Sequence, residues 1–237
     1  NLSAAMTVVD ADFTNVTEVT TLTAGNVAVN ITLGAEAKEA TITIITLGNA
    51  TNTVNASAYT STALTITGGT GADTIQGGTG NDILSGGNGA DTYKFNATGA
   101  LNGTDVITFV VANDKFNFDN MGTFTFNSIE ATLAGTNDVS LDNKITLLID
   151  GDGAAGTDTI AEIVALIEGQ GDSMHLSSGA KGVVIAGYDG DANDTARIYL
   201  VDDSVGDTAG TIEADDVTLI GTLATFDVDT LTNFNFA

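Results

Sequence analysis

The sequence has no cysteine, no proline and no tryptophan, and only one histidine. Without cysteine the chain forms neither a disulfide nor a thiolate metal site, so another kind of link must hold it together if it works outside the cell. Basic residues are also scarce, because 31 Asp and Glu stand against 6 Lys and Arg, for a formal net charge of -25. Nucleic acids and anionic membranes would be repelled by this charge, whereas cations would be attracted.

Long apolar runs are missing too, since none approaches the roughly 20 residues that cross a bilayer, and we expect no membrane span. The chain begins at Asn1 without a methionine or a signal-like leader, so we interpret it as a fragment of a longer protein. Catalytic groupings are equally scarce. His175 is alone apart from Ser173 and Ser177, and neither a zinc centre nor a convincing triad is visible, so we expect no enzymatic activity.

Short stretches of alternating polar and apolar residues predict an all-β fold. Residues 1–67 contain "NVAVNITLG" and "EATITIITLG", which are typical of strands separated by turns. The segment 158–168 is the exception, because its apolar residues have helical spacing and Gly169 follows as a stop signal. We predict a β-solenoid over residues 1–118 and, over residues 119–237, a mostly β C-terminal region with this one helix.

The strongest motif is a nine-residue unit that occurs three times in residues 68–94, as G-G-x-G-x-D-x-U-x with U a large apolar residue. Ile75, Leu84 and Tyr93 are the U residues and should point inward. Glycine allows backbone conformations that turn carbonyl oxygens toward a cation, and Asp adds a hard, charged oxygen ligand. A flexible linker would not need Asp at one fixed phase, and no G-K-[ST] follows for a phosphate cradle. The predicted ligands are Asp73, Asp82, Asp91, Gly69, Gly71, Gly78, Gly80, Gly87 and Gly89.

These units resemble the calcium-binding nonapeptide repeat of RTX (haemolysin-type) proteins. The resemblance implies a parallel β-roll in which two units make one turn, so that equivalent residues lie eighteen apart. Asp73 and Asp91 then complete one Ca²⁺ site with glycine carbonyls. Asp82 has only Leu64 and Ala100 at that spacing, so either groups outside the repeats complete its site or the site is partial. The resemblance implies one to four ions in all.

Two further segments are candidates for Ca²⁺ ligands. The stretch "GTDVITFVVANDKFNF" resembles the segment that closes RTX rolls, and its Asp105 and Asp114 either bind Ca²⁺ or cap turns. In "YDGDAND", the residues Asp189, Asp191 and Asn193 alternate as in a calcium loop, with an acidic surface turn as the alternative.

As a family, RTX proteins leave bacterial cells through a type I channel guided by an uncleaved C-terminal signal, and the end "TFDVDTLTNFNFA" is similar to such signals. The composition resembles the C-terminal part of secreted surface-layer (S-layer) proteins. We therefore expect a Ca²⁺-dependent structural module that folds and assembles at the cell surface. Its partners would be Ca²⁺ and further copies of itself, with any polysaccharide contact made outside this chain. The alternative is the C-terminal secretion and folding module of an RTX exoenzyme or adhesin whose active part lies upstream.

Overall fold

The computed structural model describes residues 1–110, 112–127, 139–141, 144–150, 160, 164, 174–177, 180–188, 195–203, 212, 214–223, 235 and 236. The chain forms two compact units. The first contains Asn1–Asn120 together with Phe234–Ala237, and the second contains Met121–Asn233. Each unit is mostly β, as the alternation in the sequence predicted.

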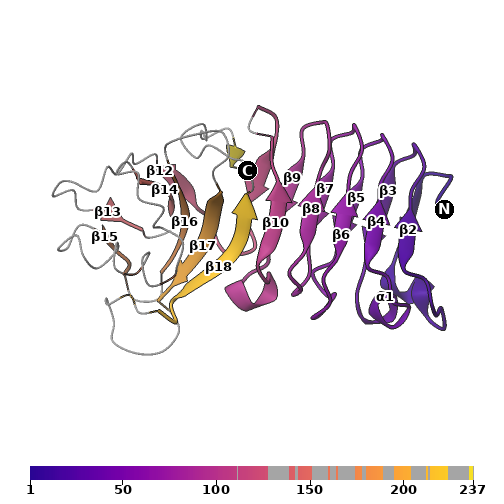
Figure 1. Cartoon of the computed structure of the whole chain (residues 1–237), viewed down its shortest axis with the longest axis horizontal. Coiled ribbons are helices and arrows are strands. Elements are labelled where there is room, and N and C mark those ends of the chain that lie inside the picture. Colours follow the sequence, from indigo (N-terminus) through magenta and orange to yellow (C-terminus); the bar gives the residue numbers. More distant parts are fainter. Residues whose placement is uncertain are drawn as a thin grey trace. The chain divides into compact units, whose positions relative to one another are not determined.

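The first unit is a parallel β-roll built from two sheets of short strands (Figure 1). One sheet has six strands in the order β1-β3-β5-β7-β9-β11. Their bounds are Met6–Val8 (β1), Val29–Thr32 (β3), Thr53–Asn55 (β5), Thr74–Gln76 (β7), Thr92–Lys94 (β9) and Lys115–Asn117 (β11). All neighbouring pairs in this sheet are parallel. The predicted fold class is therefore confirmed.

The other sheet of the roll has the order β10-β8-β6-β4-β2, again with parallel pairing. Its strands are Thr21–Thr23 (β2), Ile44–Thr46 (β4), Thr65–Thr67 (β6), Ile83–Ser85 (β8) and Asp105–Thr108 (β10). Because the chain alternates between the two sheets, each turn of the roll contributes one strand to each of them.

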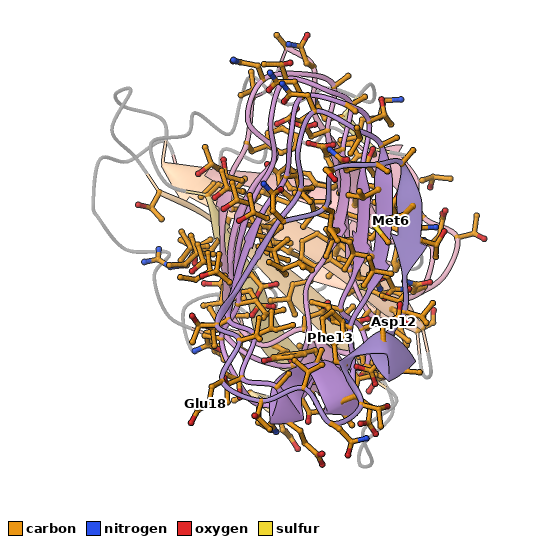
Figure 2. All side chains as sticks on the ribbon, turned by 90° about the vertical axis from the view of Figure 1, so that its right-hand side faces the viewer. Met6, Asp12, Phe13 and Glu18 are labelled. Carbon is orange, nitrogen blue, oxygen red and sulfur yellow. The ribbon has the colours of Figure 1, made fainter. Side chains whose placement is uncertain are left out.

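In the three-residue strands β2, β4, β5, β6, β7, β8, β9 and β11, the middle residue is buried and points into the roll, since side chains alternate along a strand. Ile75, Leu84 and Tyr93 are all buried, so the inward direction predicted for them is confirmed. The residues that precede them are more exposed. Viewed from the end where β1 lies, the roll has side chains of both sheets packed between the ribbons (Figure 2).

The turns of the roll differ in length. Equivalent residues lie 23, 21, 18 and 23 positions apart in successive turns, and only the turn from Asp73 to Asp91 has the eighteen-residue spacing on this side. The longer turns contain short helices: η1 (Asp10–Phe13), α1 (Ala35–Glu39) and η2 (Gly99–Leu101). Asp10 fixes α1 by accepting hydrogen bonds from the backbone N–H groups of Gly34, Glu36 and Ala37. Extra residues therefore leave the strands in register.

The second unit has strands in the order β12-β14-β16-β17-β18, parallel at first and antiparallel from β16 onward. Their bounds are Thr125–Asn127 (β12), Lys144–Asp150 (β14), Lys181–Tyr188 (β16), Ala196–Asp202 (β17) and Val217–Leu223 (β18). A separate parallel pair joins β13 (Val139–Ser140) and β15 (Met174–His175). Long antiparallel strands thus distinguish this unit from the roll.

The predicted helix over residues 158–168 lies mostly outside the described residues. Ile160 and Val164, the two positions of that segment that the structure describes, are helical and pack against a core that includes Val184 and Tyr199. They are the i and i+4 residues of the predicted apolar stripe. In the described part of the chain, no helix has the length and apolar character to span a bilayer.

Candidate metal centre

Four side chains stack along one edge of the roll, one from each of four successive turns. They are Asn52, Asp73, Asp91 and Asp114, and each directly precedes a strand of the β1–β11 sheet. The Oδ1 atom of each Asp accepts a hydrogen bond from the backbone N–H of the equivalent residue one turn earlier. These bonds measure 2.8 Å from Asn52 to Asp73, 2.8 Å from Asp73 to Asp91, and 3.0 Å from Asp91 to Asp114. We call this stack the first carboxylate column.

The opposite edge carries a second carboxylate column. Asp82 Oδ1 accepts a 2.7 Å hydrogen bond from the N–H of Leu64, and the N–H of Asp82 donates to Asp105 Oδ1 at 2.9 Å. The eighteen-residue spacing pointed to Ala100 as the next neighbour of Asp82. The turn is 23 residues long instead, and it brings Asp105 to that position. An acid from outside the repeats therefore lies where the sequence indicated that one was needed.

Three of the carboxylates also close their own turn. Their Oδ2 atoms accept hydrogen bonds from the N–H four residues earlier, from Gly69 to Asp73 at 3.2 Å, from Gly78 to Asp82 at 2.8 Å and from Val110 to Asp114 at 2.8 Å. Asp91 differs, because its Oδ2 atom is buried and has no hydrogen-bond partner. A buried carboxylate oxygen without a donor is costly, and a bound cation would remove that cost.

The repeat glycines lie where successive turns approach most closely. A Cβ atom at Gly87 would be 2.3 Å from the carbonyl oxygen of Gly69, and one at Gly89 would be 2.3 Å from that of Gly71. Gly87 and Gly89 also have φ values of 91° and 135°, which residues other than glycine rarely adopt. The glycines therefore keep backbone carbonyl oxygens close to the first carboxylate column.

On the second column, Gly78 and Gly80 allow the same close approach. Cβ atoms there would lie 2.1 Å from the carbonyl oxygen of Tyr59 and 2.4 Å from that of Thr62. All six repeat glycines predicted as ligands thus lie beside a carboxylate column, at contacts that no larger residue permits.

Burial raises the pKa of every carboxyl group in both columns, because a charge is disfavoured away from water. The five Asp side chains are at most 3% exposed. Burial, together with the charges of Asp114 and Asp73, raises the pKa of Asp91 to about 6. Burial and the nearby Asp82 raise the pKa of Asp105 to about 8. Ionisation of these carboxyl groups is therefore less favourable than ionisation of exposed carboxyl groups.

The donor atoms fit a hard cation. In the described residues, no three acidic, histidine or cysteine side chains gather into one metal-binding group. The acidic residues are instead neighbours in pairs, each joined by a backbone N–H to carboxylate hydrogen bond and by repulsion between their charges: Asp73 with Asp91, Asp91 with Asp114, and Asp82 with Asp105. Ca²⁺ takes six to eight oxygen ligands and accepts backbone carbonyls, so each pair would share an ion with carbonyl oxygens of the glycine turns.

Asn52 is a member of the first carboxylate column that the sequence motifs did not identify. Its segment, "GNATNTV" at 48–54, is a degenerate copy of "GTGADTI" at 69–75, with Asn in place of Asp and Ala50 in place of the second glycine. Aligning the two segments would have revealed an additional turn of the roll. The candidates Asp189, Asp191 and Asn193 lie outside the described residues.

Comparison with known proteins supports the interpretation of the repeats. Residues 65–93 match the family model described as RTX calcium-binding nonapeptide repeat (4 copies). RTX repeats bind Ca²⁺ as structural ions and are typical of secreted, extracellular bacterial proteins. No curated protein matches the chain. The chain thus carries an RTX calcium-binding module.

Proposed function

We propose that this chain is a Ca²⁺-dependent structural module of a secreted bacterial surface protein, and that it has no catalytic role. One observation carries the proposal: five buried carboxylates are stacked in two columns, and the Oδ2 atom of Asp91 is buried without any donor. Buried carboxylates without a counter-charge destabilise the folded state, and bound cations would remove this destabilisation. Where Ca²⁺ is scarce, repulsion between the carboxylates shifts the roll toward an open state, and millimolar Ca²⁺ outside the cell shifts it toward the folded one.

The expected stabilisation is modest for each ion and larger for the set. Extracellular calcium modules have Kd values on the order of 0.1 to 1 mM. At about 1 mM Ca²⁺ each such site adds roughly 0.5 to 1.5 kcal/mol, because ligand binding stabilises only the folded state. Three ions, one for each carboxylate pair, would therefore decide whether a marginally stable domain is folded.

Self-assembly is the finer part of the proposal, and one surface supports it. The outward residues of β2, β4, β6, β8 and β10 form two columns in register on one sheet face, and none of them is charged. They are Thr21, Ile44, Thr65, Ile83 and Val106 in one column, and Thr23, Thr46, Thr67, Ser85 and Thr108 in the other. Ile44, Ile83 and Val106 are 42%, 52% and 43% exposed. We call this surface the uncharged face.

The distribution of charge indicates that a second copy of the chain binds to the uncharged face. Two copies that each carry a net charge of -25 repel one another over most approaches. The uncharged face, with its hydroxyl and methyl groups, is where they can meet, with their sheets packed face to face. The outer face of the other sheet is more polar and includes Lys94 and Lys115. We propose that this contact builds an S-layer or a similar surface lattice.

Electron microscopy and light scattering during Ca²⁺ addition test the proposal. Ordered sheets or growing particles that dissolve on chelation support the surface-assembly role. Dispersed, folded monomers at every Ca²⁺ concentration would contradict self-assembly and favour the alternative role, the folding and secretion module of a larger exoenzyme or adhesin.

A further inference from the structure

Asn52 occupies, in its own turn, the position that Asp73 occupies one turn later. The register shows this directly, because Thr53 pairs with Thr74 and each of the two polar residues comes immediately before. Asn52 is 1% exposed, so its amide group is withdrawn from water. It is therefore the first member of the first carboxylate column, and it differs from the others in carrying an amide in place of a carboxylate.

The Asn52 amide has a full set of partners. Its Oδ1 atom accepts a 3.1 Å hydrogen bond from the N–H of Val29, continuing the column by one more turn. The two hydrogens of its Nδ2 atom are shared among three oxygens within hydrogen-bond distance, at 3.1 Å to the carbonyl of Gly48, at 2.6 Å to the carbonyl of Ala50 and at 2.9 Å to Asp73 Oδ1. The partly positive NH₂ group thus lies among two carbonyl oxygens and one carboxylate oxygen.

The same three positions recur one turn later. Gly69 stacks on the carbonyl of Gly48 and Gly71 on that of Ala50, so their own carbonyls are the equivalent acceptors. The third acceptor is Asp91 Oδ1, which faces Asp73 as Asp73 Oδ1 faces Asn52. The central residue in this turn is Asp73, whose ionised carboxylate has no hydrogen to donate. A cation is needed here, and none is needed around Asn52.

We propose that the Asn52 side-chain amide performs in its turn the task that Ca²⁺ performs in the following turns, and so ends the calcium column on the N-terminal side. The inference rests on the proposed binding of Ca²⁺ by the column. It makes residue 52 the position that sets how many ions the column holds. It also divides the roll into turns before residue 55 that are held by hydrogen bonds and turns from residue 68 onward that are held by ions.

The test is to convert the amide into a carboxylate. The variant Asn52→Asp should bind one more Ca²⁺ ion per chain than the wild type, measured by equilibrium dialysis and by isothermal titration calorimetry. Its melting temperature in chelator should fall below that of the wild type, and saturating Ca²⁺ should restore it. The matched control is Asn30→Asp, which adds the same charge at an exposed position on β3 and should leave the number of ions unchanged.

The outcomes separate the two claims. Wild-type binding of Ca²⁺ with no additional ion in Asn52→Asp overturns the inference and leaves the proposed function standing. Absence of Ca²⁺ binding by the wild type overturns both. Should Asn52→Asp not fold, hydrogen exchange of the wild type in chelator decides instead. The inference predicts that the amides of Ala24 and Val29, whose acceptors Thr46 and Asn52 lie before residue 55, stay protected while those of Asp73 and Asp91 lose protection. Uniform behaviour of all four amides overturns it.

Discussion

Asp91 is the residue at which the two requirements of the first carboxylate column conflict. Its Oδ1 atom is needed to hold Asp73 in register, whereas its Oδ2 atom is buried with no donor. Neighbouring charges from Asp73 and Asp114 add to the cost of ionising it. The calcium-free fold is therefore weakest here, and Ca²⁺ has most to contribute at this position.

Replacement of Asp91 by Asn should make the stability of this part of the roll less dependent on Ca²⁺. An amide at position 91 supplies N–H donors where Asp91 Oδ2 has none, as the Asn52 amide does two turns earlier. The variant should be about 1 kcal/mol more stable than the wild type in chelator, the typical value of one satisfied hydrogen bond. It should also bind fewer Ca²⁺ ions. Urea unfolding with and without Ca²⁺ measures both effects.

Asp119→Asn is the matched control for this change, because Asp119 is exposed and its carboxylate and N–H hydrogen-bond to Asn117 in the same turn. It should alter neither the stability in chelator nor the number of ions. Equal effects of the two substitutions would show that net charge, and not the column, governs the response.

The pKa of Asp105 predicts how the calcium-free protein responds to pH. Burial and Asp82 raise this pKa from 3.8 to about 8, so the folded state holds a proton that the unfolded state has released. Stability is then greatest at low pH and falls as the pH rises through about 8. In calcium-free buffer the melting temperature should fall between pH 6.5 and 9, a range in which exposed carboxylates are already ionised.

The variant Asp105→Asn isolates this effect, since it cannot ionise, and its melting temperature should change much less over the same range. With Ca²⁺ bound the wild-type trend should reverse, because the ion requires the deprotonated carboxylate. A calcium-free protein that gains stability from pH 6.5 to 9 would contradict the account.

At the scale of strands and turns, the sequence predicts the roll better than it predicts the site. The apolar residue of each repeat identifies the buried face, and the eighteen-residue spacing identifies the pair Asp73 and Asp91. The eighteen-residue spacing did not predict the pair Asp82 and Asp105. A 23-residue turn containing η2 separates them, and the repeat pattern does not specify turn length. The motif did not identify Asn52, because its turn has Asn in place of the acid and Ala in place of one glycine of the pattern.

The uncharged face allows a prediction at the same scale. The substitution Ile83→Lys places a charge at Ile83, which at 52% is more exposed than Ile44 and Val106 on the same face. It should abolish or greatly weaken Ca²⁺-dependent assembly while leaving Ca²⁺ binding unchanged, because the side chain points away from both carboxylate columns. Analytical ultracentrifugation and calorimetry measure the two properties separately.

Asn30→Lys, on the outer side of the other sheet, is the control and should assemble like the wild type. If both variants assemble normally, the uncharged face is not the contact between copies.

At the scale of the whole molecule, the end of the chain contributes to the roll. Phe236 forms a parallel bridge with Phe116 and contacts its ring at a centroid distance of 6.2 Å. The Asn235 side-chain amide donates a 3.0 Å hydrogen bond to the carbonyl of Asp114. The last turn of the first carboxylate column is thus covered by residues 235 and 236.

The substitution Phe236→Ala should therefore destabilise the first unit. A fully buried aromatic contributes about 3 to 5 kcal/mol, and the loss here should be smaller because Phe236 is partly exposed. Because the lost contacts adjoin Asp114, the Ca²⁺ affinity should fall as well. Differential scanning calorimetry at fixed Ca²⁺ measures the first effect and calcium titration the second. Unchanged values for both would show that the C-terminal contact is incidental.

The central claim is that Ca²⁺ decides whether the roll from residue 68 onward is folded. Far-ultraviolet circular dichroism of the wild type during a Ca²⁺ titration from excess chelator tests it most directly, with Mg²⁺ as the ion control and Asp91→Ala as the protein control. The account predicts a gain of β signal with Ca²⁺ at submillimolar to millimolar concentration, none with Mg²⁺, and a weakened gain in Asp91→Ala. Identical spectra in chelator and in saturating Ca²⁺ would contradict it.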